Sequence, residues 1–259
     1  MILSRRVALG GVQLDEIHDA VVIRRVDTGV PHETVSAVNR MGGAGQRMTS
    51  QHWETLEIGV TYAIDVNKRQ PELRREVFDA VNSWAIRGGW LTTTSQPGKR
   101  VWIDKVIVPG SGDLRDWTGD FTIGFRAYGV PFWQEEVPTP LVIGSVARGN
   151  LNMEVKGNVR TVADMTARNI SGQVINQMTL GIGDSSFTLS GIALGGAESL
   201  VISHTENGLL QIRAGNRDVY HLRTPESSDD LYVDPGVRMV RIESPRAVQL
   251  TVRAAGRFV

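Results

Sequence analysis

The stretch Phe125-Arg-Ala-Tyr-Gly-Val-Pro-Phe-Trp133, followed by Gln-Glu-Glu-Val-Pro-Thr-Pro140, separates two parts of the chain that differ in composition. All six tryptophans lie at or before Trp133, so the large aromatic side chains that anchor a core or a contact surface belong to the first part. Pro138 and Pro140 cannot donate to a sheet ladder, and each biases the preceding residue toward an extended conformation. The sequence therefore predicts a domain boundary here, with one domain at 1–137 and a second at 138–259.

Size and charge limit the classes of protein that this chain can represent. Its 259 residues suffice for two cores. Basic and acidic side chains number 16 and 17 before Pro138, and 12 and 11 after it. Because binding to a polyanion usually requires a basic excess, we expect no sequence-specific nucleic-acid binding and no binding to anionic membranes. The sequence contains no run of about 18 apolar residues, so we predict no membrane insertion. The N-terminal apolar stretch is broken too early for a signal peptide. Because the chain has no cysteine, disulfides and thiolate chemistry are excluded.

The first part combines predicted strands with one predicted helix. Residues 56–66 and 100–108 alternate apolar and polar positions, as half-buried strands do. Between them, residues 71–87 carry apolar side chains at helical spacing, with Pro71 placed to begin the helix and Gly88-Gly89 to end it. Residues 28–51 are polar, contain Met41-Gly-Gly-Ala-Gly45 and lack a sustained period. They predict a long loop or a protruding hairpin, and long loops of this kind are often functional.

The second part is predicted to be almost entirely β-structure. Short runs rich in β-branched residues recur with turn formers between them, at 178–182, 186–189, 200–204, 209–213, 238–242 and 248–253. This spacing is typical of an antiparallel sandwich. Asn207-Gly208 predicts a two-residue hairpin turn, and Asp234-Pro-Gly236 predicts another turn.

No pattern of ligands or nucleophiles points to an active site. The histidines are scattered without cysteine company, which favours ordinary hydrogen bonding over zinc; they are His18, His32, His52, His204 and His221. Asp229, Asp230 and Asp234 supply oxygen ligands of the kind that calcium prefers, but they lack the EF-hand pattern, so turn stabilisation is favoured.

Signatures of hydrolases and phosphate sites are also missing. Neither 41–45 nor Gly195-Gly196 has the strand-to-helix context of a phosphate-binding loop, and no Gly-x-Ser-x-Gly motif occurs. The adjacent Glu135 and Glu136 are interpreted as solvated charges of the linker rather than a glycosidase pair. We therefore predict a protein that is not an enzyme, with no catalytic, cofactor-binding or metal-binding residue and no cofactor.

Taken in order, the two parts resemble the distal tail protein (Dit) family of long-tailed siphophages and related prophages. In the first part the resemblance rests on the order of strand, helix 71–87, Trp90-Leu91, strand 101–108 and the closing segment 121–133. In the second part it rests on 192–210 and on Ser227-Ser-Asp-Asp-Leu-Tyr-Val-Asp-Pro-Gly236. The resemblance covers most of the chain, and its weight comes from the order of these motifs.

The resemblance implies a mainly β protein with two domains. The N-terminal domain would be a ring-forming β-sandwich with one flanking helix and a belt-like extension, and the C-terminal domain a galectin-like β-sandwich. Six copies would form a ring at the virion tail tip, after assembly in the host cytoplasm. The ring would contact the tail tube protein and the tail-tip hub or tail-associated lysin, with the tape measure protein in its lumen. The belt would come from 28–51.

Four alternatives remain open at this point. Trp117 and Trp133 are candidate anchors of a ring contact, although packing in their own core is favoured. Carbohydrate binding would have to rely on the second part's few aromatic rings, Phe187, Tyr220, Tyr232 and Phe258. The remaining functional alternatives are a cell-wall hydrolase and another hub component of similar fold.

Overall fold

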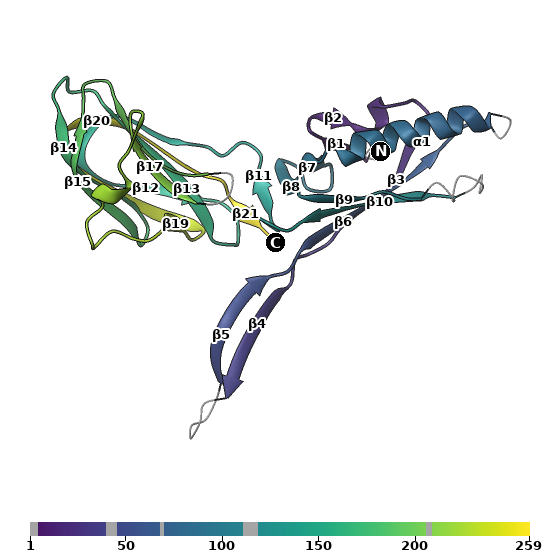
Figure 1. Ribbon diagram of the computed structural model, residues 1–259, viewed down its shortest axis with the longest axis horizontal. Helices are drawn as coiled ribbons and strands as arrows, with labels where there is room; N and C mark the ends of the chain where they lie inside the picture. The colour runs from purple at the N-terminus through teal and green to yellow at the C-terminus, as the bar shows by residue number, and fades with distance from the viewer. Residues whose placement is uncertain (1–4, 40–45, 68–69, 111–118, 206–208) are drawn as a thin grey trace. The chain divides into compact units, whose positions relative to one another are not determined.

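The computed structural model describes residues 5–39, 46–67, 70–110, 119–205 and 209–259, without the side chains of 38–39 and 46–51. Two compact units account for the chain, Met1–Gln134 with Val259, and Glu135–Phe258. The division falls close to the boundary that the sequence predicts between Val137 and Pro138. Both units are mainly β (Figure 1), which confirms the predicted fold class.

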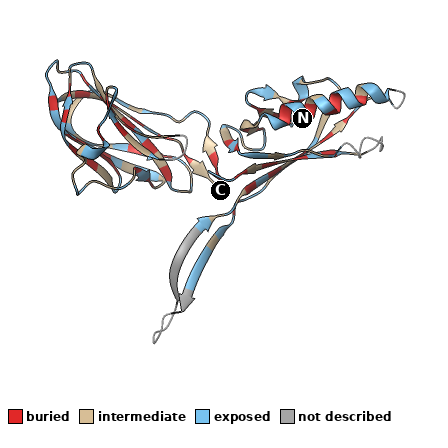
Figure 2. Cartoon of the chain, viewed as in Figure 1, coloured by how far each residue is buried: buried red, intermediate tan, exposed pale blue. Residues whose placement is uncertain are grey.

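Two sheets and one helix form the core of the first unit in the part of the chain that the structure describes. One sheet contains β2 (Val12–Gln13), β1 (Val7–Leu9), β7 (Gly89–Thr93) and β8 (Lys99–Ile103), in that order. The other contains β3 (Val21–Thr28), β6 (Leu56–Ile64), β10 (Phe121–Ala127) and β9 (Lys105–Ile107). Burial alternates along β6 and β10, so one face of the second sheet is buried and the other is not (Figure 2). A short 3₁₀ turn, η1 (Leu14–Glu16), follows β2.

The helix α1 (Pro71–Ile86), which the sequence predicts at 71–87, covers the buried face of the second sheet. Pro71 is its first residue, and Gly88 and Gly89 after it take positive φ angles of 63° and 110°, which glycine adopts readily. The Phe78 ring packs edge-on against Phe121 of β10 at 5.2 Å between centroids. Among the described residues, no helix is long and apolar enough to cross a membrane.

Residues 100–108, predicted as one strand, are two strands in different sheets. The chain leaves β8 at Ile103 and enters β9 at Lys105. Asp104 explains the break, because its Oδ2 accepts hydrogen bonds from the amides of Tyr128 and Gly129, at 2.6 and 3.0 Å. An alternating pattern cannot reveal such a crossing, since it continues unchanged through the bend.

Within 28–51 the structure places a hairpin, one of the two predicted alternatives. Its strands β4 (Glu33–Asn39) and β5 (Gln46–Trp53) pair with each other, and among the described strands with no other. We call this hairpin the arm. The glycine-rich 41–45 lies outside the described residues. Trp133, at the start of β11 (Trp133–Glu135), is only 2% exposed, so the core reading of this tryptophan is confirmed. Trp117 lies outside the described residues.

The second unit is one curled antiparallel sheet in the order β15-β14-β20-β13-β16-β17-β18, with β12 beside β20 and β19 beside β13. The strands of this sheet are β12 (Leu141–Val155), β13 (Thr161–Asn169), β14 (Ile175–Ile182), β15 (Ser185–Leu194), β16 (Ser199–His204), β17 (Leu210–Ala214), β18 (Arg217–Asp218), β19 (Tyr232–Val233) and β20 (Gly236–Ala254). The unit also contains a 3₁₀ turn, η3 (Tyr220–Leu222), and a short strand outside this sheet, β21 (Arg257–Phe258). The Asn207-Gly208 turn lies outside the described residues.

The 19 residues of β20 form a single strand where the sequence predicts two, at 238–242 and 248–253. Residues 240–243 pair with β14, whereas residues 248–254 pair with β13. One strand therefore pairs with β14 along one part and with β13 along another, and the sheet curls around a continuous core. The prediction failed because the exposed Pro245 and Arg246 interrupt the apolar pattern without ending the strand.

Candidate interaction surfaces

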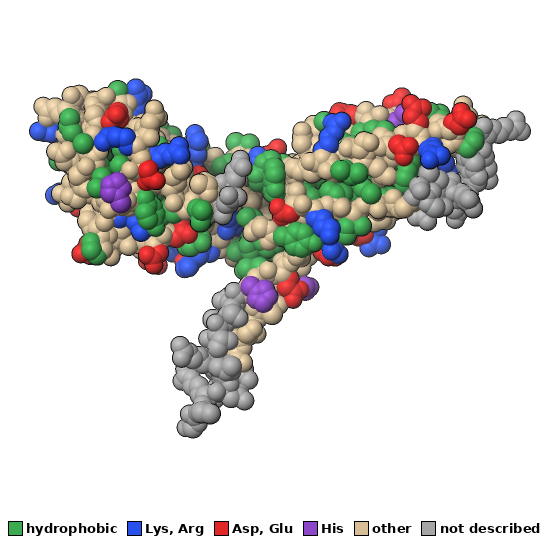
Figure 3. All heavy atoms as spheres, in the orientation of Figure 1, with side chains coloured by type: hydrophobic (Ala, Val, Ile, Leu, Met, Phe, Trp, Pro, Cys, Tyr) green, Lys and Arg blue, Asp and Glu red, His purple; other side chains and the backbone are tan. Residues whose placement is uncertain are grey.

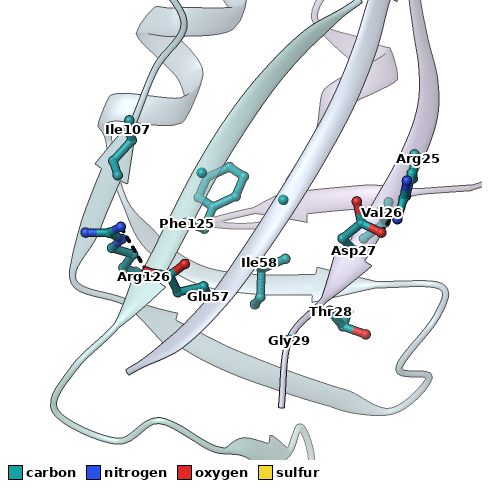
Figure 4. Close-up of a pocket in the computed structure, with 12 residues that line it drawn as sticks. Arg25, Val26, Asp27, Thr28, Gly29, Glu57, Ile58, Ile107, Phe125 and Arg126 are labelled. Carbon is teal, nitrogen blue, oxygen red and sulfur yellow. Dashed lines mark hydrogen bonds and ion pairs between the residues drawn. The ribbon is translucent and has the colours of Figure 1, made fainter. Parts of the chain in front are cut away.

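The outer face of the sheet β3-β6-β10-β9 carries an open hollow (Figure 4). Its volume is about 650 Å³, and residues of all four strands line it. The register sets one row of residues across the four strands, Asp27, Gly59, Gly124 and Ile107. The two central positions of this row have no side chain. The floor of the hollow is therefore bare backbone.

Polar groups border this floor. Glu57 and Arg126 form an ion pair of 2.9 Å across β6 and β10, and Arg25 pairs with Asp27 at 2.5 Å along β3. On the other side of the glycine row, the hydroxyls of Thr61 and Thr122 lie 3.0 Å apart. The charges on this face compensate each other locally. Basic and acidic side chains are also intermingled over the side of the molecule that Figure 3 shows.

Neither glycine of the floor is required by the unit's own structure. Neither has a positive φ, and an added Cβ would lie 3.7 Å from Asp27 at Gly59 and 3.5 Å from Ile107 at Gly124, which is ordinary contact. Glycine inside a strand costs about 0.5 to 1 kcal/mol relative to alanine, and it often marks the close approach of another molecule. Neither backbone conformation nor lack of space within the described unit therefore requires glycine at these two positions.

We expect Gly59→Ala and Gly124→Ala each to raise the free energy of unfolding by about 0.5 to 1 kcal/mol, because alanine restricts the unfolded chain more and fits the folded one. Urea denaturation followed by circular dichroism measures this change. Gly29→Ala is the matched control and should destabilise, since its Cβ would lie 2.5 Å from the Glu57 carbonyl oxygen. Equal destabilisation by all three substitutions would contradict the argument.

A second exposed surface of the first unit is aromatic. Trp102 of β8 is 46% exposed and packs edge-on against Trp90 of β7, with 5.4 Å between ring centroids. The guanidinium of Arg100 lies 4.0 Å over the Trp90 ring. Tryptophan and arginine are enriched in the energetic centres of protein interfaces. Sequence reasoning named Trp117 and Trp133 instead, because which face of a strand is covered cannot be read from composition.

Comparison with known proteins shows which fold this architecture has. No protein-family model matches the sequence, and no curated protein matches it. The crystal structure of the SPP1 Dit protein, described as a paradigm of the hub adsorption apparatus in phages that infect Gram-positive bacteria, superimposes with a TM-score of 0.68 and 12% identity, over 98% of this chain and 99% of that one. The chain has the Dit fold. A chain of the phage p2 baseplate in its activated conformation with Sr matches at a TM-score of 0.46 and 9% identity, over 96% and 98% of the two chains.

Two of the three carboxylates for which the sequence favours turn stabilisation over calcium binding lie beside basic side chains. Asp234 forms a bidentate pair with Arg160, at 2.8 and 3.3 Å, and Asp230 contacts His204. Within the described residues, no group of three or more histidine or acidic side chains could hold a metal ion. Glu135 lies 2.6 Å from Lys156 in an ion pair. These groups hold strands and turns together.

His204 lies between two carboxylates, those of Asp164 and Asp230. The carboxylate of Asp164, 3.9 Å from Nδ1, raises the pKa of His204, burial lowers it, and Asp230 raises it further, for a net increase. Nε2 of His204 lies 2.5 Å from Oδ1 of Asp230. Burial raises the pKa of Asp230, but hydrogen bonds from His204 and from the Leu231 amide outweigh it, so the net change is a decrease. The pair therefore links β16 to the segment before β19.

These pKa shifts predict how the stability of the second unit depends on pH. The raised His204 pKa contributes stability that is fully present below about pH 6.5, the ordinary histidine value, and is lost as pH rises through the folded value. The lowered Asp230 pKa contributes stability that is lost only as pH falls below about 4. Urea denaturation from pH 5 to 8 should show a falling stability that His204→Gln flattens. An unchanged slope in that variant would disprove the assignment.

Proposed function

We propose that this protein is a structural component of a phage tail tip, in which six copies form a ring that joins the tail tube to the hub. The observation that carries the proposal is the Dit fold, which extends over 98% of the chain and 99% of the SPP1 Dit protein. The match includes both units, and few residues of either chain lie outside the superimposed region. A component shaped throughout like a hub protein is best explained by a role in such a hub.

The first unit has the features that a ring requires. A head-to-tail interface closes only when each copy presents two different complementary surfaces. The arm offers one, because a two-stranded ribbon without a core of its own is marginally stable in water and gains from a partner. The open edges of the sheet β3-β6-β10-β9 offer another, since pairing β3 of one copy with β9 of the next would satisfy both edges.

Joining the sheets in this way would also give the outer face a role. The helix α1 covers the opposite face, so the face with Gly59 and Gly124 would line the lumen of the ring. A wall of bare backbone, hydroxyls and paired charges offers few groups that could hold a passing chain. This suits a lumen that surrounds the tape measure protein and later conducts the phage genome.

The remaining partners follow from the place of such a ring. One rim would contact the tail tube protein, and the other the tail-tip hub or tail-associated lysin. The protein would assemble in the host cytoplasm and end in the virion tail tip. Its role is that of a scaffold, without a catalytic step or a cofactor.

Immunogold electron microscopy on particles that carry this gene tests the position. Antibodies against the purified chain should label the end of the tail far from the capsid. Pre-immune serum is the control for non-specific binding at that end. Labelling of the capsid or of the whole tube would refute the proposal. So would a lack of any labelling on both intact and detergent-opened tails.

A further inference from the structure

The turn between β14 and β15 stands between two small hollows of the second unit. One hollow, of about 150 Å³, reaches from this turn to Tyr232, Asp234 and Arg160. The other, of about 260 Å³, reaches from the same turn to Met239 and Arg241. Both are lined by Gly183, Asp184 and Ser185, so the two hollows adjoin. Their combined size falls in the lower part of the range of small-molecule sites, about 300 to 1,000 Å³.

The turn is held rigidly in this position. The amide of Gly183 donates to the Met239 carbonyl at 2.9 Å, and the Ser185 hydroxyl donates to the Tyr232 carbonyl at 2.8 Å. Arg160 and Asp234 fix each other by their bidentate pair. The guanidinium of Arg238 donates to two backbone carbonyls of the loop before β20. A site of this kind loses little conformational freedom when a ligand binds.

Tyr232 provides an open aromatic face at the rim. Its side chain is 44% exposed, and among the described residues no other ring or cation stacks on it. Tyr220, the other exposed tyrosine of this unit, differs, because the guanidinium of Arg223 lies 4.0 Å over its ring. An exposed, unoccupied ring beside a polar hollow is the arrangement that an amphipathic ring-shaped ligand fits.

Two charged groups of the hollows are left without partners within the described part of the chain. Asp184 makes no hydrogen bond or salt bridge there, only a longer-range interaction with Arg160, and the guanidinium of Arg241 makes none either. One is an acceptor and the other a donor. A hydroxyl group can donate to the first and accept from the second. Because carboxylates and guanidiniums are mixed, the site favours neither an anion nor a cation.

We propose that these hollows form a subsite for a neutral saccharide, with a pyranose ring stacked on Tyr232 and its hydroxyls bound by Asp184 and by the Arg160–Asp234 pair. Arg241 would bind a second sugar ring in the adjoining hollow. This inference does not depend on ring formation, since all its residues belong to one unit of one copy. It adds a surface-recognition function to the proposed scaffold role.

Saturation-transfer NMR with the full-length protein tests the proposal, with glucose, galactose, N-acetylglucosamine and rhamnose as separate probes and inorganic phosphate as the anionic comparison. We expect saturable binding of at least one sugar, with a dissociation constant of about 1 to 10 mM, and no binding of phosphate. Tyr232→Ala should weaken the binding at least about tenfold, and Asp184→Asn should weaken it as well. Tyr220→Ala, the matched control, should change it less than about twofold.

Circular dichroism of each variant shows whether the fold is retained, and Asp184→Asn, in an exposed turn, serves as the test if Tyr232→Ala unfolds. The proposal is overturned if none of the four sugars binds saturably. It is equally overturned if phosphate alone binds, or if folded Asp184→Asn and Tyr232→Ala proteins bind sugar as tightly as Tyr220→Ala.

Discussion

An Asn169→Asp protein is expected to lose about 3 to 5 kcal/mol of unfolding free energy at neutral pH, as is typical when a buried charge is left unpaired. Asn169 is fully buried at the end of β13. Its Nδ2 lies 2.6 Å from the carbonyl oxygen of Gln173 and 3.0 Å from those of Leu194 and Gly195. An aspartate would turn a second carboxylate oxygen toward these three acceptors. It could not donate unless it were protonated.

Urea denaturation at pH 7 and at pH 4 measures this effect. The loss of unfolding free energy should be smaller at pH 4, because protonation of the new aspartate restores one hydrogen-bond donor. Asn216→Asp makes the same chemical change at an exposed position of the turn between β17 and β18, and it should cost less than about 0.5 kcal/mol. Equal stability of the two variants at pH 7 would show that the amide of Asn169 does not hold these segments together.

Shortening the arm is expected to abolish the ring while leaving the chain folded. Val35 and Gln51 are directly paired, so residues 36–50 can be replaced by Asn-Gly, which favours a two-residue turn. This design retains Trp53, whose ring packs edge-on against Phe132 at 5.2 Å between centroids. Within the described part of the removed segment, the residues of β4 and β5 pair only with each other, and none belongs to the buried cores.

Light scattering should give the mass of one chain for the shortened protein, and urea denaturation should give a stability within about 1 kcal/mol of the parent. Tyr220→Ala, a surface change in the other unit, is the control and should leave the assembly unchanged. A ring of normal mass from the shortened chain would remove the arm from the interface. A shortened chain that is unfolded would instead assign the arm a role in folding.

The sequence predicted those elements whose local signals agree with each other. The helix α1 has apolar spacing, an initial proline and a terminal pair of glycines, and all three signals mark the same segment. The strand β6 alternates because one of its faces lies on a core. Such patterns depend on neighbours in the sequence, and these are known before the fold is.

The remaining features depend on contacts between distant residues. Gly59 and Gly124 are each an ordinary glycine in a strand, and only the register brings them side by side. The crossing at Asp104 depends on amides more than 20 residues away. Tyr232 was considered as one of four aromatic residues, but the hollow beside it is formed by a turn about 50 residues earlier. No local signal reports these relations.

The mass of the purified protein in solution, measured by light scattering and followed by electron microscopy of the same sample, tests the ring most directly. We predict a species about six times the 28.4 kDa mass of the chain, seen as a closed ring with a central hole. A single species of 28.4 kDa at every concentration up to about 100 µM, without rings on the grid, would contradict the account.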